Sequence, residues 1–227
     1  MDKKITYNPA IDCLRTIAIF AVIGIHTTTR ILEASVFNVQ RFIFTFFINQ
    51  ASRFAVPLFF MISGFVLELN YSSNQNYFVY LKKRFSRIFL PYLFWSIIYY
   101  YFVYTKHTIL FGTTLLFGAA SYQLYFIPTL LIFYIAFPGI HKIYRFIANK
   151  WTLIALGILQ LILLAYTYYI HPLPFFYPLA IAILNYYVFL LGMVASHHED
   201  LLSKITGWKM LTAILSGIFA VIVFLEG

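Results

Sequence analysis

The sequence predicts an all-α protein, a polytopic transmembrane helical bundle of about seven spans with a cytoplasmic N-terminus. Three observations lead to this fold class. Hydrophobic residues make up 62% of the 227 residues and charged residues only 10%, whereas about a quarter of a soluble domain is charged. The few charges are clustered, so that long stretches lack them. Lys and Arg concentrate between alternate stretches, as expected for a chain that crosses a membrane repeatedly.

The length of each apolar stretch gives the predicted spans, because about 20 helical residues cross the hydrocarbon core. Residues 151–198 contain no Asp, Glu, Lys or Arg. This run is too long for one span, and Pro172 and Pro174 divide it because closely spaced prolines end a helix. Apolar and polar residues do not alternate, which favours helices over a membrane barrel. The predicted spans are 11–29, 46–69, 89–105, 122–139, 152–170, 176–195 and 208–225.

Lys and Arg also set the orientation. With the N-terminus inside, eleven of them fall in inner segments and four in outer ones, in agreement with the positive-inside rule. Basic loops facing anionic lipid account for the net charge of +9 without a nucleic-acid partner. Residues 1–227 are expected to form a single transmembrane domain. Because the chain stops at Gly227, directly after a hydrophobic run, we expect further C-terminal helices to be missing.

The first predicted span carries three ionisable residues on one helical face. Arg15 and His26 are 11 positions apart, so at about 100° per residue their directions differ by about 20°. Asp12 differs from His26 by about 40° and is spaced to pair with Arg15. Ionisable residues are costly in a bilayer and often mark functional sites. An isolated His26 could instead reach the outer interface or hydrogen-bond another helix.

The second predicted span contains Pro57, which should kink it because proline leaves a helical carbonyl without its partner. Ser63 and Gly64 form a small surface on which another helix can pack closely. A nucleophile elbow would need Gly two residues before Ser63, where Met61 stands. We therefore interpret Ser63 as a packing or positioning residue.

A basic segment precedes the third predicted span. Arg84 and Arg87 are spaced i, i+3 on a short helix, with Lys83 beside them. Two neighbouring guanidinium groups suit a ligand that carries phosphates. The positive-inside rule explains the same residues equally well, so this segment alone does not define a function.

Taken together, these segments resemble the motifs of the integral-membrane acyltransferase 3 family. Arg15 and His26 match its signature of Arg, ten residues and His, and residues 59–65 resemble its FF-x-x-SGF motif. Residues 84–91 are similar to its RxxR(I/L)xxP loop. Residues 123–127 resemble a His-Leu-Trp-Phe-Leu segment, but with Gln in place of His and Tyr in place of Trp. The role of that histidine is therefore not carried over, and the resemblance covers residues 7 to about 140.

The resemblance implies a multi-pass O-acyltransferase of the cell membrane. It would move an acyl group, commonly acetyl, from cytoplasmic acyl-CoA to a hydroxyl of a surface polysaccharide or glycolipid. His26 would be the general base, and Lys83, Arg84 and Arg87 would hold the phosphates of coenzyme A. Arg15 would either bind phosphate or stay paired with Asp12.

The positions of these residues lead to a further hypothesis about the acyl donor. With Arg15 near the inner boundary, His26 falls in the outer half of the membrane, about 16.5 Å further along the helix. The extended pantetheine arm would then pass between helices and deliver its acyl group to an outward-facing site.

Two other classes of function remain open. A polysaccharide exporter or transport subunit of the same family would carry polar residues on several helices around a midplane cavity. The fifth and sixth spans offer little beyond Gln160, Asn185 and tyrosines, which favours the enzyme. A packing or assembly subunit would use Arg15 and His26 only as structural pairings.

The remaining histidines are interpreted as solvated loop residues. The cluster at residues 197–200 resembles a metal site only in composition, because adjacent residues rarely converge on one ion. No metal site is predicted. His107, His141 and His171 fall at predicted loops.

Overall fold

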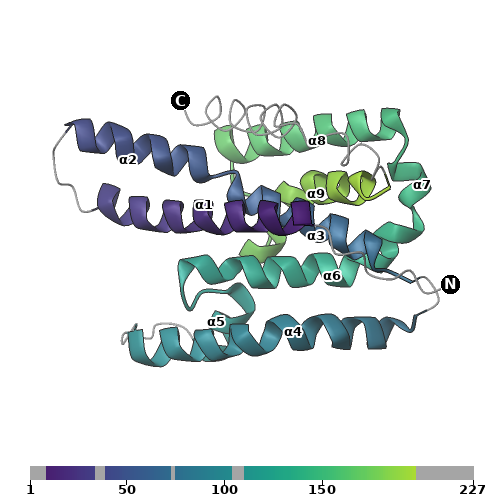
Figure 1. Cartoon of the computed structure of the whole chain (residues 1–227), viewed down its shortest axis with the longest axis horizontal. Coiled ribbons are helices and arrows are strands. Elements are labelled where there is room, and N and C mark those ends of the chain that lie inside the picture. The colour runs from purple at the N-terminus through teal and green to yellow at the C-terminus, as the bar shows by residue number, and fades with distance from the viewer. Residues whose placement is uncertain (1–8, 34–38, 73–74, 104–109, 198–227) are drawn as a thin grey trace. The chain divides into compact units, whose positions relative to one another are not determined.

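The computed structural model describes residues 9–33, 39–72, 75–103 and 110–197 (Figure 1). Over these ranges the chain is helical and contains no strand, which confirms the predicted all-α class. The longer helices are α1 (Pro9–Glu33), α2 (Val39–Ser52), α3 (Ala55–Leu69), α4 (Tyr77–Ile98), α6 (Phe126–Lys142), α8 (Lys150–Tyr169) and α9 (Tyr177–Ala195). Short elements join them: the π-helix η1 (Tyr99–Val103), α5 (Phe111–Phe117), the 3₁₀-helix η2 (Tyr122–Tyr125) and α7 (Tyr144–Ile147).

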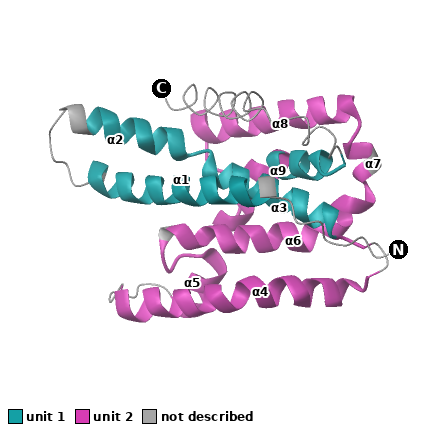
Figure 2. Cartoon of the chain, viewed as in Figure 1, with its two compact units in different colours: residues 1–70, 188–227 teal, residues 71–187 magenta. Residues whose placement is uncertain are grey.

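The chain consists of two compact units (Figure 2). Unit 1 comprises residues 1–70 and 188–227, and unit 2 comprises residues 71–187. The boundary at residue 188 falls inside α9, so this helix contributes its first part to unit 2 and its second part to unit 1. The candidate residues on α1 and α3 therefore belong to unit 1, and those on α4 belong to unit 2.

Five helical stretches in the described ranges are long and apolar enough to cross a membrane: Ile11–Leu32, Phe42–Leu69, Gln123–Lys142, Lys150–Tyr169 and Tyr177–Ala195. Each overlaps a predicted span. The predicted span 89–105 corresponds to the second half of α4 and to η1, but its helix begins earlier, at Tyr77. Charged residues limit membrane insertion rather than helix formation, so α4 runs through the basic segment. The predicted span 208–225 lies outside the described residues.

Pro57 does more than bend the second span. α2 ends at Ser52 and α3 begins at Ala55, so the span consists of two helices. Proline cannot donate to the carbonyl of the residue four positions earlier, and its ring collides with that carbonyl. That residue is Arg53, which lies in the break. The sequence therefore located the irregularity correctly but predicted a kink where the structure has a complete interruption.

The proline-containing segment between α8 and α9 confirms the predicted division of the apolar run. α8 ends at Tyr169 and α9 begins at Tyr177. Within unit 2 the two helices are joined by hydrogen bonds to backbone carbonyls: the Gln160 amide donates to Leu184 over 2.6 Å, and the Tyr186 hydroxyl donates to Leu156 over 2.6 Å. The Gln160 side chain thus has a structural contact between helices.

Candidate functional site

The three ionisable residues of the first span lie on the single uninterrupted helix α1. The Arg15 guanidinium donates to the Asp12 carboxylate over 3.1 Å, and both side chains are 44% exposed. The predicted i, i+3 pair is therefore present, and it partly neutralises a cation within an apolar span. His26 lies on the same helix and is partly buried.

The part of α1 that carries His26 is fixed against α2. The Asn49 amide on α2 lies 2.9 Å from the hydroxyls of Thr28 and Thr29 and 3.3 Å from the Ile25 carbonyl. These contacts fall on both sides of His26 along the helix. Because Asn49 is buried, its hydrogen bonds are shielded from water and hold the local position of α1.

The Ser63-Gly64 pair of the FF-x-x-SGF segment has a packing role in unit 1. The Ser63 hydroxyl donates to the Phe59 carbonyl of its own helix over 2.8 Å. Gly64 on α3 faces the second part of α9: an added Cβ would lie 3.1 Å from the carbonyl carbon of Phe189. From the other side, a Cβ added at Gly192 would lie 2.8 Å from the Met61 carbonyl carbon. The two helices approach so closely that only glycine fits.

Sequence reasoning missed one ionisable contact in unit 1. His197 Nε2 lies 2.9 Å from the Glu68 carboxylate at the end of α3, and the Glu68 side chain is only 2% exposed. The interpretation of His197 as a solvated loop residue was therefore wrong, because its ring is paired and about half exposed. The sequence did contain a signal for this contact: Glu68 lies inside an apolar span, where a carboxylate without a partner is costly to bury.

The candidate phosphate-binding residues all lie on α4. Lys83 and Arg87 are exposed and Arg84 is partly buried. Pro91 stands inside the helix four residues after Arg87, so the Arg87 carbonyl lacks the usual helical donor. The spacing of the RxxR(I/L)xxP segment therefore gives this basic turn a carbonyl without a helical donor as well as two guanidinium groups.

A cluster of rings joins the start of α4 to the end of α6 in unit 2. Tyr71 makes edge contacts with Tyr80, Phe137 and His141 at centroid distances of 5.5, 5.1 and 4.8 Å. The Arg84 guanidinium lies 5.9 Å from the centroid of the Tyr80 ring. Burial raises the pKa of the Tyr80 phenol, against the opposing effect of Arg84, so this phenol stays protonated.

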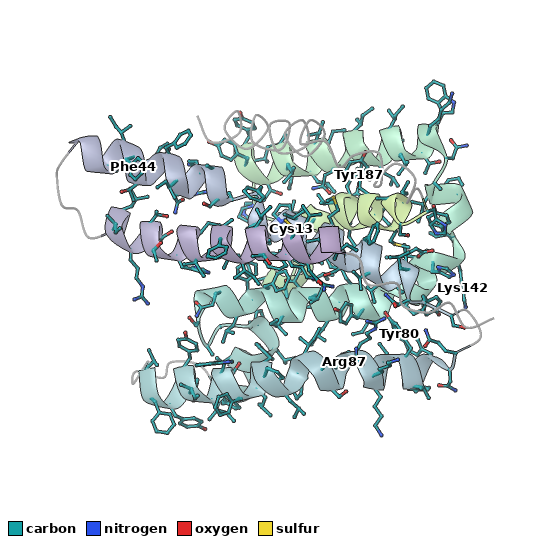
Figure 3. The ribbon with its side chains drawn as sticks, in the orientation of Figure 1. Cys13, Phe44, Tyr80, Arg87, Lys142 and Tyr187 are labelled. Atoms are coloured by element: carbon teal, nitrogen blue, oxygen red, sulfur yellow. The ribbon has the colours of Figure 1, made fainter. Side chains whose placement is uncertain are left out.

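The ring cluster corrects the interpretation of His141. It is not a loop residue, because it stands in the last turn of α6 and packs against the rings of Tyr71 and Phe137. Figure 3 shows Tyr80 on α4 and Lys142 at the end of α6, at the same end of this helix pair. The sequence gave little indication of these ring contacts, because the rings that meet are up to 70 positions apart.

The two units differ sharply in charge. All seven Asp and Glu residues of the chain fall in unit 1. Unit 2 contains no carboxylate side chain, but it contains Lys82, Lys83, Arg84, Arg87, Lys106, Lys142, Arg145 and Lys150. Its cations therefore have no carboxylate side chain within the unit to neutralise them. In the described ranges, no group of three or more His, Cys, Asp or Glu side chains is arranged to hold a metal ion.

These features define a multi-pass helical membrane protein with a histidine on its first span and a basic turn on α4. A family model described as an acyltransferase domain, that of the acyltransferase 3 family, matches residues 8–227. The chain belongs to this family, as its motifs predicted, and is thus a membrane acyltransferase. No curated protein and no solved structure matches it.

Proposed function

We propose that this protein transfers an acyl group, most simply acetyl, from cytoplasmic acyl-CoA to a hydroxyl of a surface polysaccharide or glycolipid in the cell membrane. The family match supports acyl transfer. The single observation that carries the finer proposal is the Arg15–His26 face of α1, because it places an imidazole within an apolar span. An ionisable residue in such a span is a functional-site candidate, because it is costly to keep there.

His26 acts in this proposal as the general base. A sugar hydroxyl is a poor nucleophile, and an imidazole can accept its proton as the oxygen attacks the thioester carbonyl. A new ester bond forms, the carbon–sulfur bond breaks, and the departing thiolate takes up a proton as coenzyme A. Asn49 holds the His26 segment through Ile25, Thr28 and Thr29, which supports a fixed position for the base.

Lys83, Arg84 and Arg87 bind the phosphates of coenzyme A in this proposal. They belong to the unit that lacks carboxylates, so a phosphate ligand meets no competing anion of that unit. Arg15 is engaged with Asp12 in the structure. We therefore favour a structural ion pair for Arg15 over phosphate binding.

Membranes that carry the wild type, His26→Gln or His171→Gln, supplied with radiolabelled acetyl-CoA, test the proposal. His26→Gln should lower labelling of surface glycan by about 10²- to 10⁴-fold, the usual contribution of a general base. His171→Gln is the matched control, because His171 is exposed in the α8–α9 connection and its ring Nδ1 lies 2.9 Å from the neighbouring Pro172 carbonyl. Equal labelling by all three proteins at equal protein levels would contradict the role of His26.

A further inference from the structure

Buried polar side chains gather on the two neighbouring helices α1 and α2 of unit 1 (Figure 1). These residues belong to apolar spans, where a buried polar group costs free energy unless it is hydrogen-bonded. Each of them therefore requires a reason for its position. The residues, none more than 9% exposed, are Thr28, Thr45, Asn49, Gln50 and Ser52.

Gln50 differs from its neighbours in how its side chain is satisfied. The Thr28 hydroxyl donates to the Gly24 and Ile25 carbonyls, and the Asn49 amide donates to the Thr28 hydroxyl. The side-chain oxygen of Gln50 is enclosed, yet it accepts no hydrogen bond from the described residues. An acceptor without a donor destabilises the protein alone. A ligand that carries a donor would remove this cost when it binds.

The position of Gln50 adds a second observation. Asn49, directly before it, donates to the Ile25 carbonyl and the Thr28 hydroxyl, which lie on either side of His26 along α1. The last turn of α2 is therefore level with His26. Gln50 also stands directly before the interruption between α2 and α3. Membrane proteins commonly form substrate sites at such interrupted helices.

We propose that the Gln50 side-chain oxygen accepts a hydrogen bond from a second hydroxyl of the glycan acceptor, and thereby selects which hydroxyl reaches His26. A sugar carries several hydroxyls, and a base alone does not distinguish them. The inference rests on the proposed transfer to a glycan and adds how the acceptor is oriented. The thioester carbonyl cannot satisfy Gln50, because it has no hydrogen to donate. The amide and hydroxyl groups of the pantetheine arm can donate, so binding of the acyl donor is measured separately.

The substitution Gln50→Met separates recognition of the acceptor from a structural role. Methionine fills a similar space without an amide oxygen, so Tm should stay equal or rise. Labelling of surface glycan from radiolabelled acetyl-CoA should fall about 3- to 10-fold, the loss of one hydrogen bond to the substrate. NMR of the released glycan should show acetyl groups on more than one hydroxyl. The Kd of the purified protein for acetyl-CoA should stay within twofold of wild type.

Two further variants complete the test. Gln50→Glu keeps an acceptor oxygen and should label more glycan than Gln50→Met. Gln160→Met is the matched control, because the Gln160 oxygen is also enclosed without a partner in the described residues, but its amide donates to the Leu184 carbonyl and joins α8 to α9. This control should lower Tm. At equal protein levels it should leave both the labelling and the acetylated hydroxyl unchanged.

Three results for Gln50→Met would overturn the inference. Wild-type labelling on a single hydroxyl would show that the oxygen meets a bound water rather than the acceptor. A lower Tm, with reduced labelling still on that single hydroxyl, would show a structural role. A Kd for acetyl-CoA that rises as much as labelling falls would assign Gln50 to the acyl donor. A wild type that labels no glycan would instead refute the proposed function itself, and the inference with it.

Discussion

Replacement of Gly192 by Ala tests the close approach of α3 and α9. An alanine Cβ at this position would lie 2.8 Å from the Met61 carbonyl carbon and 3.0 Å from the Phe65 nitrogen. Carbon atoms in contact normally lie about 3.5–4.0 Å apart. The opposing atoms are backbone, so no side chain can rotate away, and α3 and α9 must separate by about 1 Å.

The cost follows from what this separation loosens. Phe60, Leu67, Phe189 and Met193 are at most 2% exposed and belong to these two helices. Overpacking of such a core costs about 1–3 kcal/mol, and we expect Gly192→Ala to lower the free energy of unfolding by about 2–3 kcal/mol. For a chain of this size each kcal/mol shifts Tm by about 2–4 °C, so Tm should fall by about 5–10 °C.

Thermal unfolding in detergent, followed by tryptophan fluorescence and by size exclusion after heating, measures the effect. Gly139→Ala is the matched control, because Gly139 is also helical but a Cβ there meets nothing within 4 Å. Its Tm should stay equal or rise slightly, since alanine favours a helix by about 1 kcal/mol. A Gly192→Ala protein with the Tm of Gly139→Ala would refute the packing argument.

The remaining predictions concern hydrogen bonds of unit 1. Asn49→Leu should destabilise the protein by about 1–2 kcal/mol and lower transfer activity, because it removes the amide contacts to Thr28 and Thr29. Phe44→Leu on the exposed face of α2 should leave thermal stability and activity near wild type. His197→Leu should lower Tm more than Glu68→Leu does, because it leaves a buried carboxylate short of one partner, whereas the half-exposed imidazole can turn to water. Equal Tm values for these last two variants would contradict that asymmetry.

Hydropathy and local spacing were sufficient to predict five apolar helical stretches and the Asp12–Arg15 pair. Both depend on residues close in sequence: apolar length decides whether a segment can span, and i, i+3 spacing decides which side chains meet. The start of α4 at Tyr77 was missed, because the charged residues that exclude it from the bilayer do not prevent a helix. A kink was predicted where the structure has a break at Arg53. Proline shows where a helix is disturbed, but not whether it bends or ends there.

The contacts that sequence could not supply join distant segments. Glu68 and His197 are 129 positions apart, and no periodicity relates α3 to the turn that follows α9. Tyr71 precedes α4 and meets His141 where the start of α4 packs beside the end of α6. Gly64 was recognised as a small packing residue, but its partner helix required the structure. Local sequence rules therefore identified several of the contacting residues, but their partners could be found only from the tertiary structure.

The different charges of the two units follow from one physical rule about buried ionisable groups. An apolar chain can bury an ionisable group only if a neighbour offsets its cost. Two pairs in the described part of unit 1 follow this rule, since Asp12 is matched by Arg15 and Glu68 by His197. Unit 2 contains cations and no carboxylate side chain, so any neutralising anion has to come from outside the unit. A phosphate-bearing donor or an anionic lipid surface would supply that charge.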